Sequence, residues 1–187
     1  MGDGFLMIYP VTYCLLSMQL EGKMEKIEFN LLRAEVGAQI KEIDKIYSAI
    51  SERKKGAVKN IANLESLGYK LHNLYCAFED LFKIVARHFE NSVEDIARYH
   101  KELLKRMSFT IEDVRPALLS EESFRLLDEL RMFRHIFRHA YAYDLQYEKL
   151  KPVIKSADML RGLYKREIER FLQKLNDEID DNSVHAR

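Results

Sequence analysis

Residues that interrupt helices are scarce in this chain of 187 residues, which has seven glycines, three prolines and no tryptophan. Few glycines and prolines, together with 32% charged residues, are typical of a helical protein. Neither sign of charge is in excess, because 30 basic side chains balance 30 acidic ones. This balance excludes a broadly basic nucleic-acid coat protein and a polybasic membrane binder. A site for a polyanion must therefore be a local patch.

Cysteine is also rare, and the two that occur, Cys14 and Cys76, form no Cys-x-x-Cys pair. The sequence therefore indicates no disulfide framework and favours a reducing, cytoplasmic location. The length predicts one domain. A chain of this size buries about 70% of its unfolded surface, so it needs neither a disulfide nor a metal to fold.

The first residues differ from the rest of the chain. Residues 5–20 are apolar and nearly uncharged, but the stretch is short for a membrane span and Pro10 interrupts it. A secretory signal would begin with basic residues, whereas the charge that precedes this stretch is Asp3. We expect residues 1–24 to be a poorly packed N-terminal extension. An interfacial anchor and a partner-binding arm are the alternatives.

Apolar residues recur at steps of three and four in several segments, which is the spacing of one helix face. We predict helices that begin near Ile27, that cover 58–89, that run from a cap at Ser92 to Met107, that follow a cap at Ser120, and that cover about 149–175. The clearest apolar seam is formed by Leu71, Tyr75, Phe78, Phe82, Val85 and Phe89. No segment alternates at period two for long enough to be a strand.

The predicted fold is an all-α, antiparallel bundle of four to five helices over residues 25–176. Residues 177–187 are acidic and lack an apolar face, so we expect a disordered tail.

One segment concentrates cationic side chains. Residues 130–143 read LRMFRHIFRHAYAY, with three arginines, two histidines and no acid. Arginines that lie beside packed helices are costly unless an anion or a carboxylate meets them. The segment is therefore a candidate site for an anion, and a solvated helix face is the plain alternative.

Within this segment Arg134, His139 and Tyr141 form the pattern Arg-x4-His-x-Tyr, and the polar His135 directly follows the arginine. The pattern resembles the signature of the HEPN superfamily. It is most similar to the HepT-type branch, the ribonuclease toxins of HEPN–MNT toxin–antitoxin pairs. The doubled Phe-Arg-His at 133–135 and 137–139 fits that branch as well. The similarity in architecture covers about residues 26–175 and is sharp over 134–141.

The residue types suit metal-independent cleavage of RNA. Histidine titrates near neutral pH and can move the 2′-OH proton, while arginine stays charged and matches two phosphate oxygens. We assign His139 as base or acid and Arg134 as the stabiliser of the transition state. His135 and Arg138 would support the motif and contact RNA phosphate. Attack by the 2′-OH would leave a 2′,3′-cyclic phosphate, and neither a metal nor a cofactor is expected.

The spacing creates a geometric problem, since residues five apart on an ideal helix lie about 140° apart around its axis. Arg134 and His139 should therefore face different directions. Either the helix loosens near His139, or two copies of the helix meet across a two-fold axis. The resemblance implies the second solution, because HEPN ribonucleases are typically dimers with paired motifs in a cleft between protomers.

The resemblance also implies a role for Tyr141. In the HepT branch this tyrosine is modified with AMP by the cognate MNT nucleotidyltransferase antitoxin. An anionic nucleotidyl group beside Arg134 and Arg138 would occupy the phosphate site and block RNA. Without the resemblance, Tyr141 would be a tyrosine at the edge of the bundle with its hydroxyl in water.

The sequence argues against two kinds of metal site. His135 and His139 have the spacing of two zinc ligands, but Ile136 stands where the zinc-protease motif has glutamate. A di-iron bundle needs Glu-x-x-His, which is absent. The remaining polar residues of the helices are predicted to be ordinary, with Glu79 in solvent, Cys76 a buried thiol without a catalytic partner, and His72, His88 and His100 unrelated bundle residues.

Two rival functions stay open. The first is a HEPN-like bundle that binds nucleotide, RNA or a protein partner without cutting. The second is an adaptor whose arginines pair with an acidic partner. The predicted partners of the enzyme are RNA, an MNT-type antitoxin and a second copy of the chain, and no membrane.

Overall fold

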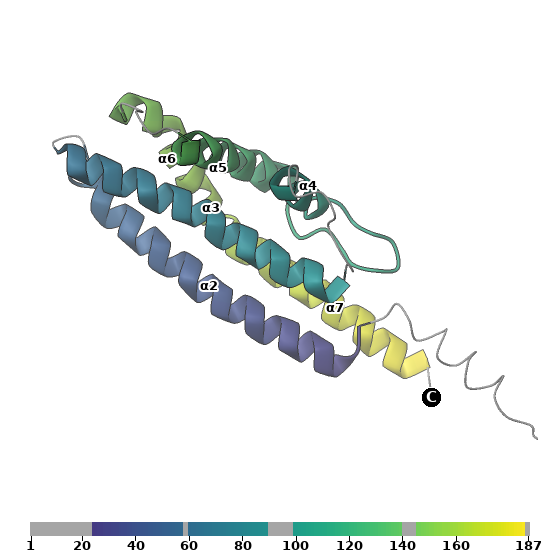
Figure 1. The fold of residues 1–187 in the computed structure, drawn as a ribbon. Coiled ribbons are helices and arrows are strands. Elements are labelled where there is room, and N and C mark those ends of the chain that lie inside the picture. Colours follow the sequence, from purple (N-terminus) through teal and green to yellow (C-terminus); the bar gives the residue numbers. More distant parts are fainter. Residues whose placement is uncertain (1–23, 58–59, 90–98, 140–144, 186–187) are drawn as a thin grey trace, which may run out of the picture.

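The computed structural model describes residues 24–57, 60–89, 99–139 and 145–185. These residues form six helices and no strand, which confirms the all-α bundle (Figure 1). The helices are α2 (Lys26–Lys54), α3 (Ile61–Phe89), α4 (Tyr99–Arg106), α5 (Glu121–His139), α6 (Tyr147–Arg161) and α7 (Tyr164–His185). The predicted N-terminal extension lies outside the described residues, except for Met24.

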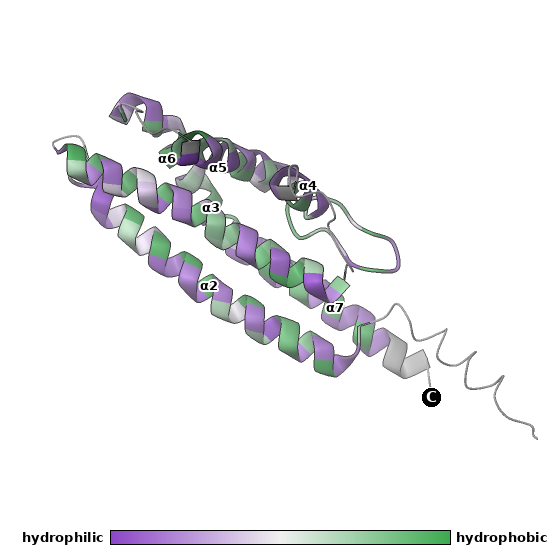
Figure 2. Cartoon of the chain, viewed as in Figure 1, coloured by the Kyte–Doolittle hydropathy of each residue, from purple (hydrophilic) through white to green (hydrophobic). Residues whose placement is uncertain are grey.

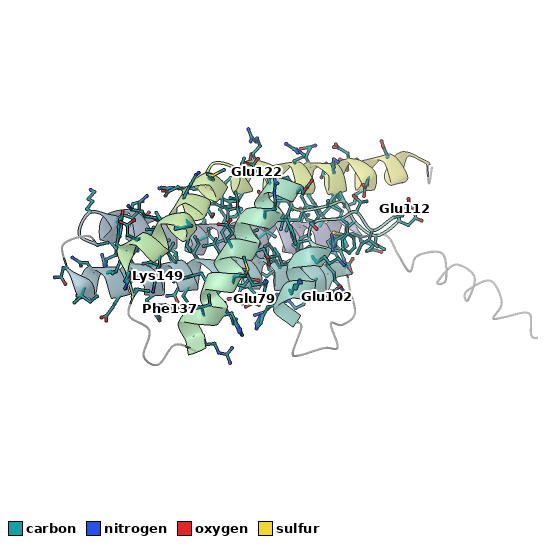
Figure 3. The ribbon with its side chains drawn as sticks, turned by 90° about the horizontal axis from the view of Figure 1, so that it is seen from above. Glu79, Glu102, Glu112, Glu122, Phe137 and Lys149 are labelled. Carbon is teal, nitrogen blue, oxygen red and sulfur yellow. The ribbon has the colours of Figure 1, made fainter. Side chains whose placement is uncertain are left out.

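Two long helices, α2 and α3, form an antiparallel pair, and α7 runs along them (Figure 1). The shorter helices α4 and α5 lie side by side on α3, and α6 packs against α5 (Figure 3). The seam predicted in α3 is confirmed, because Leu71, Phe82 and Val85 are fully buried. Hydrophobic and hydrophilic residues alternate along the helices (Figure 2). None of the described helices has an apolar stretch long enough to cross a membrane.

The predicted last helix is in fact two helices. The helical conformation is interrupted between α6 and α7 at Gly162, which follows the last residue of α6. Tyr164 then begins α7, with its ring stacked on Tyr47 at 5.8 Å and its hydroxyl donating to Asp44 of α2 at 2.5 Å. The break places Tyr164 in the core beside α2.

The C-terminal segment is helical, so the prediction of a disordered tail is wrong for residues 177–185. Ile179 packs against the core. Lys26, at the start of α2, donates to Asn176 at 2.8 Å and forms an ion pair with Asp180 at 3.0 Å. A residue 150 positions earlier in the sequence therefore holds the end of α7. The composition of α7 alone does not reveal this contact.

The helix that carries the candidate motif begins as predicted. Ser120 caps α5, because its hydroxyl oxygen accepts a hydrogen bond from the backbone N–H of Ser123 at 3.1 Å. Before the cap, the segment 107–120 is held by the buried Arg115, whose guanidinium donates to the carbonyl oxygen of Arg106 at 3.0 Å. Both contacts fix the position of α5 on the bundle.

A glycine lets α3 and α5 approach closely beside the motif. A Cβ atom on Gly68 would lie 3.0 Å from the ring of Phe137 and 3.1 Å from a methyl group of Leu145. Phe137 in turn contacts Phe133, with ring centroids 5.4 Å apart. The aromatic residues of the doubled Phe-Arg-His thus pack inward, and Arg134, which lies between them in sequence, is placed against α3.

Candidate active site

Arg134 lies where α5 crosses α3 and α4. Its side chain is 13% exposed, and its Nη2 atom is 3.7 Å from Oε2 of Glu79 on α3. Figure 3 shows Glu79 beside the middle of α5, on the side of α4. The guanidinium that the motif supplies is therefore mostly buried and held against Glu79.

Glu79 is the carboxylate that joins three helices. Its side chain is 4% exposed, one of its oxygens faces Arg134, and the other, Oε1, contacts Nδ1 of His100 on α4. The hydroxyl of Tyr75, one helical turn before Glu79, donates to the carbonyl oxygen of His100 at 3.3 Å. A buried carboxylate is tolerated when cations and donors meet it, and here Arg134 and His100 do so.

Polar residues form a stripe along α3 that faces α5. His72, Cys76 and Glu79 follow one another at steps of four and three, so they share a face. The Nε2 atom of His72 lies 3.7 Å from the sulfur of Cys76, and its ring is 5.8 Å from that of Phe137. Burial, and then the charges of Arg134 and Arg138, lower the pKa of His72, which favours its neutral form.

The charge of Arg134 is stabilised by its surroundings. Burial alone would lower the pKa of the guanidinium, but the contact with Cys76 and the charge of Glu79 outweigh it and raise the pKa. The Nε atom is buried and has no hydrogen-bond partner among the described residues. Arg134 therefore stays a cation, and the described part of the chain leaves one of its donors unused.

Carboxylates from outside the arginine segment, residues 130–143, pair with two of its arginines. Arg131 donates to Asp128 at 2.6 Å, and Arg134 pairs with Glu79. Arg138 is exposed, and no described carboxylate forms an ion pair with it. Two of the three positive charges that the sequence concentrates here are therefore compensated by the protein itself.

The other predicted site residues are placed as follows. His135 is exposed on α5. His139 is the last residue of α5, and the helix continues unbroken up to it, but the side chain of His139 lies outside the described residues. Tyr141 also lies outside the described residues. The structure therefore places Arg134 beside Glu79 and Cys76 of α3.

Glu79 and His100 were missed as site residues by the sequence analysis. The prediction that Glu79 lies in solvent is wrong, because the residue is 3% exposed. The available signal was the polar stripe His72, Cys76 and Glu79, one position beyond the apolar seam of α3. His100 gave no such signal, because the contact between α3 and α4 brings it to the site.

An apolar groove runs beside the motif on the outer side of α5. It has a volume of about 380 Å³ and lies between α5 and α6, with Phe133, Phe137 and Pro152 in its lining. Two large apolar side chains of α5 are exposed along it, Met132 at 47% and Ile136 at 51%. Exposed apolar surface of this kind is typical of a binding surface. The described residues contain no group of three metal-ligating side chains.

Comparison with protein families identifies the fold. The family model for HepT-like proteins matches residues 66–175, from the first half of α3 to the middle of α7. The match covers more than half of the chain and includes the whole arginine segment, so the protein belongs to the HepT-like family of the HEPN superfamily. Membership suggests a ribonuclease or toxin of HEPN type. No curated protein and no solved structure matches the chain.

Proposed function

We propose that this protein is a metal-independent endoribonuclease. The observation that carries the proposal is Arg134, a cation fixed by the buried Glu79 within the segment that matches the HepT-like family. A guanidinium held in place before the substrate arrives stabilises the charge that develops on a transferring phosphoryl group.

The proposed reaction is an internal transesterification. A base removes the proton of a ribose 2′-OH, and the 2′-oxygen forms a bond to the adjacent phosphorus. The bond from phosphorus to the 5′-oxygen breaks, and an acid gives that oxygen a proton. Arg134 stabilises the phosphorane, and His139 serves as one of the two proton-transfer groups. His135 and the exposed Arg138 would contact RNA phosphates, and the products are a 2′,3′-cyclic phosphate and a 5′-OH.

Cleavage of RNA in the presence of EDTA tests this function. The parent should cut RNA under these conditions, and Arg134→Ala and His139→Ala should each lower the rate by at least about 100-fold. Arg125→Ala is the matched control, since Arg125 is an exposed arginine of the same helix. No cleavage by the parent, or equal cleavage by parent and both site variants, would refute the proposal. RNA that is bound but not cut would instead favour a binding protein.

We further propose that the enzyme is a homodimer with a composite site. The exposed Met132 and Ile136 and the adjacent groove offer α5 an apolar surface for a second copy beside the motif. Mixing Arg134→Ala with His139→Ala subunits tests the arrangement. If each site takes arginine and histidine from different protomers, half of the dimers are mixed and have one intact site, so about a quarter of the activity returns. If both residues come from one protomer, no activity returns.

We also propose that the protein is a cytoplasmic toxin whose antitoxin is an MNT-type nucleotidyltransferase that adds AMP to Tyr141. The proposal rests on family membership and on the position of Tyr141 shortly after the arginine segment. Co-expression with a neighbouring nucleotidyltransferase should raise the mass of the protein by one AMP group and abolish RNA cleavage. Tyr141→Phe should prevent the modification, while the control Tyr143→Phe should not. Equal modification of both variants would contradict the assignment.

A further inference from the structure

Tyr69 is an exposed aromatic residue beside the contact between α3 and α5. It is 54% exposed, although its neighbour Gly68 is buried, and a Cβ atom on Gly68 would lie 3.0 Å from the ring of Phe137. The ring of Tyr69 stacks on that of His72, with centroids 6.4 Å apart and 20° between the two planes. The ring of His72 in turn lies 5.8 Å from that of Phe137. The three rings form a row that leads outward from α5, and Tyr69 is its exposed end.

This row of rings lies close to two arginines of the motif helix. Burial, and then the charges of Arg134 and Arg138, lower the pKa of His72, so both guanidinium groups act on the ring that supports Tyr69. Arg138 is exposed, and no described carboxylate forms an ion pair with it. An uncompensated cation beside an exposed aromatic ring is the combination with which proteins bind single-stranded nucleic acid.

The order of the contacts between α3 and α5 places Tyr69 along the motif helix. Glu79 faces Arg134, whereas Gly68, which comes earlier on α3, faces Phe137, which comes later on α5. The two helices therefore run in opposite directions, and Tyr69 lies toward the C-terminal end of α5. Along the axis of α3, Tyr69 is about 15 Å from Glu79. A base bound at Tyr69 therefore belongs to a nucleotide beside the phosphate at Arg134 and does not compete with that phosphate.

Two neighbours on α3 orient the ring of Tyr69 and leave part of it open. One is His72, and the other is Lys70, whose Nζ atom lies 5.8 Å from the ring centroid. The hydroxyl group has no hydrogen-bond partner among the described residues. The ring is therefore held before a ligand arrives, so less conformational entropy is lost when a ligand stacks on it.

We propose that Tyr69 stacks a nucleobase and that, with Arg138, it forms a subsite for one nucleotide of single-stranded RNA beside the reacting phosphate. This inference rests on the proposed ribonuclease function and names its substrate class. The base stacks on the exposed part of the tyrosine ring, and the guanidinium of Arg138 binds a phosphate of the same strand. Every base has an aromatic face, so the subsite accepts all four bases. A base inside a duplex is already stacked on its neighbours, so the enzyme cuts unpaired RNA and spares paired RNA.

Binding of an RNA that cannot be cut tests the subsite without relying on catalysis. The probe is a short, fluorescent single strand with 2′-O-methyl groups, and its affinity is measured by anisotropy. We expect Tyr69→Ala to weaken binding at least about fivefold and Tyr69→Phe to keep it within about twofold of the parent, because phenylalanine keeps the aromatic face. Phe109→Ala is the matched control, since Phe109 is 42% exposed and lies before α5 begins. Unfolding midpoints in urea establish that the variants fold. Equal binding by Tyr69→Ala and the parent would overturn the inference.

A strand without bases shows whether the lost contact is to a base. An abasic strand of the same length keeps the phosphates and should bind the parent at least about fivefold less tightly than the complete strand. Tyr69→Ala should discriminate less between the two strands, because the ring on which the base stacks is gone. Discrimination by Tyr69→Ala that equals that of the parent would contradict a stacked base at this position.

Cleavage kinetics complete the test. Tyr69→Ala should raise KM for single-stranded RNA and leave kcat within about threefold of the parent, because the stack is present in the bound substrate and in the transition state alike. The parent should cut the same sequence at least about 10-fold more slowly when a complementary strand pairs with it, and equal cutting of both forms would overturn the inference. A parent that cuts RNA, with a Tyr69→Ala variant that binds the probe normally, refutes the subsite and leaves the ribonuclease function intact. A parent that cuts no RNA, although Tyr69→Ala weakens binding, refutes the ribonuclease function and supports an RNA-binding site, so the two failures are distinguishable.

Discussion

The ion pair between Glu79 and Arg134 makes a quantitative prediction about stability. Two unit charges at 3.7 Å attract each other by about 4.5 kcal/mol at an effective dielectric constant of about 20. Much of this attraction offsets the cost of removing both groups from water, since their side chains are 4% and 13% exposed. Glu79→Gln removes the charge and keeps the shape, so the mostly buried Arg134 is left without its counter-charge. We expect Glu79→Gln to lower the free energy of unfolding by about 2 kcal/mol.

A double-mutant cycle isolates the interaction from the cost of each substitution. Glu79→Gln, Arg134→Met and the double variant are unfolded in urea at one protein concentration, because a dimer would make stability depend on concentration. We expect the double variant to lose less stability than the sum of the single losses, with a coupling of about 1–2 kcal/mol. The exposed pair of Lys45 and Glu42 is the control, with an expected coupling below about 0.5 kcal/mol. Losses at Glu79 and Arg134 that add to within about 0.5 kcal/mol would refute the reasoning.

Three further predictions concern pH, packing and salt. Burial would raise the pKa of Asp44, but hydrogen bonds from Lys165 and Tyr164 outweigh this effect and lower the pKa. Asp44 therefore stabilises the fold at pH values above its unfolded pKa of about 4, and this stabilisation decreases as the pH falls below that value. Urea unfolding should therefore show that Asp44→Asn is destabilised at pH 7 and that its deficit shrinks at pH 3. Gly37→Ala should raise the free energy of unfolding by about 0.5–1 kcal/mol, because nothing lies within 4 Å of the new Cβ atom. Gly68→Ala should raise it less or lower it, because its new Cβ atom would lie 3.0 Å from the ring of Phe137. The affinity for an uncleavable single-stranded RNA can be measured by fluorescence anisotropy at 50 and 200 mM salt. If one arginine of each site is uncompensated, the affinity should fall only about threefold over this range, whereas three uncompensated arginines would give a fall of about 20-fold.

Local patterns were enough to predict the helices that form the core and the start of the motif helix. The seam of α3 was readable because its burial follows from steps of three and four along one segment. The cap at Ser120 was readable because an N-cap side chain bonds to a backbone N–H three residues away. In both cases the residues that decide the structure are neighbours in sequence.

The features that sequence reasoning missed depend on contacts between distant segments. The end of α7 is held by Lys26 at the other end of the described chain. The burial of Glu79 depends on Arg134 and His100, which are 55 and 21 positions away. An isolated glutamate in an amphipathic helix is most often in solvent, so no local rule would have placed it in the core. Only the packing of α4 and α5 on α3 makes it part of a site.

The course of α5 limits how the site can be completed. The helix α5 runs as far as His139, and residues 140–144, where a loosened helix would continue the chain, lie outside the described residues. In a regular helix the positions of Arg134 and His139 lie about 140° apart, and Arg134 already faces Glu79 on α3. If the protein is the proposed ribonuclease and α5 keeps regular helical geometry, the proton-transfer group next to Arg134 comes from another helix or from another protomer. In the proposed composite dimer, a second copy of the chain supplies His139. Mixing Arg134→Ala with His139→Ala subunits tests the second source, since activity returns only if the two residues of a site come from different protomers.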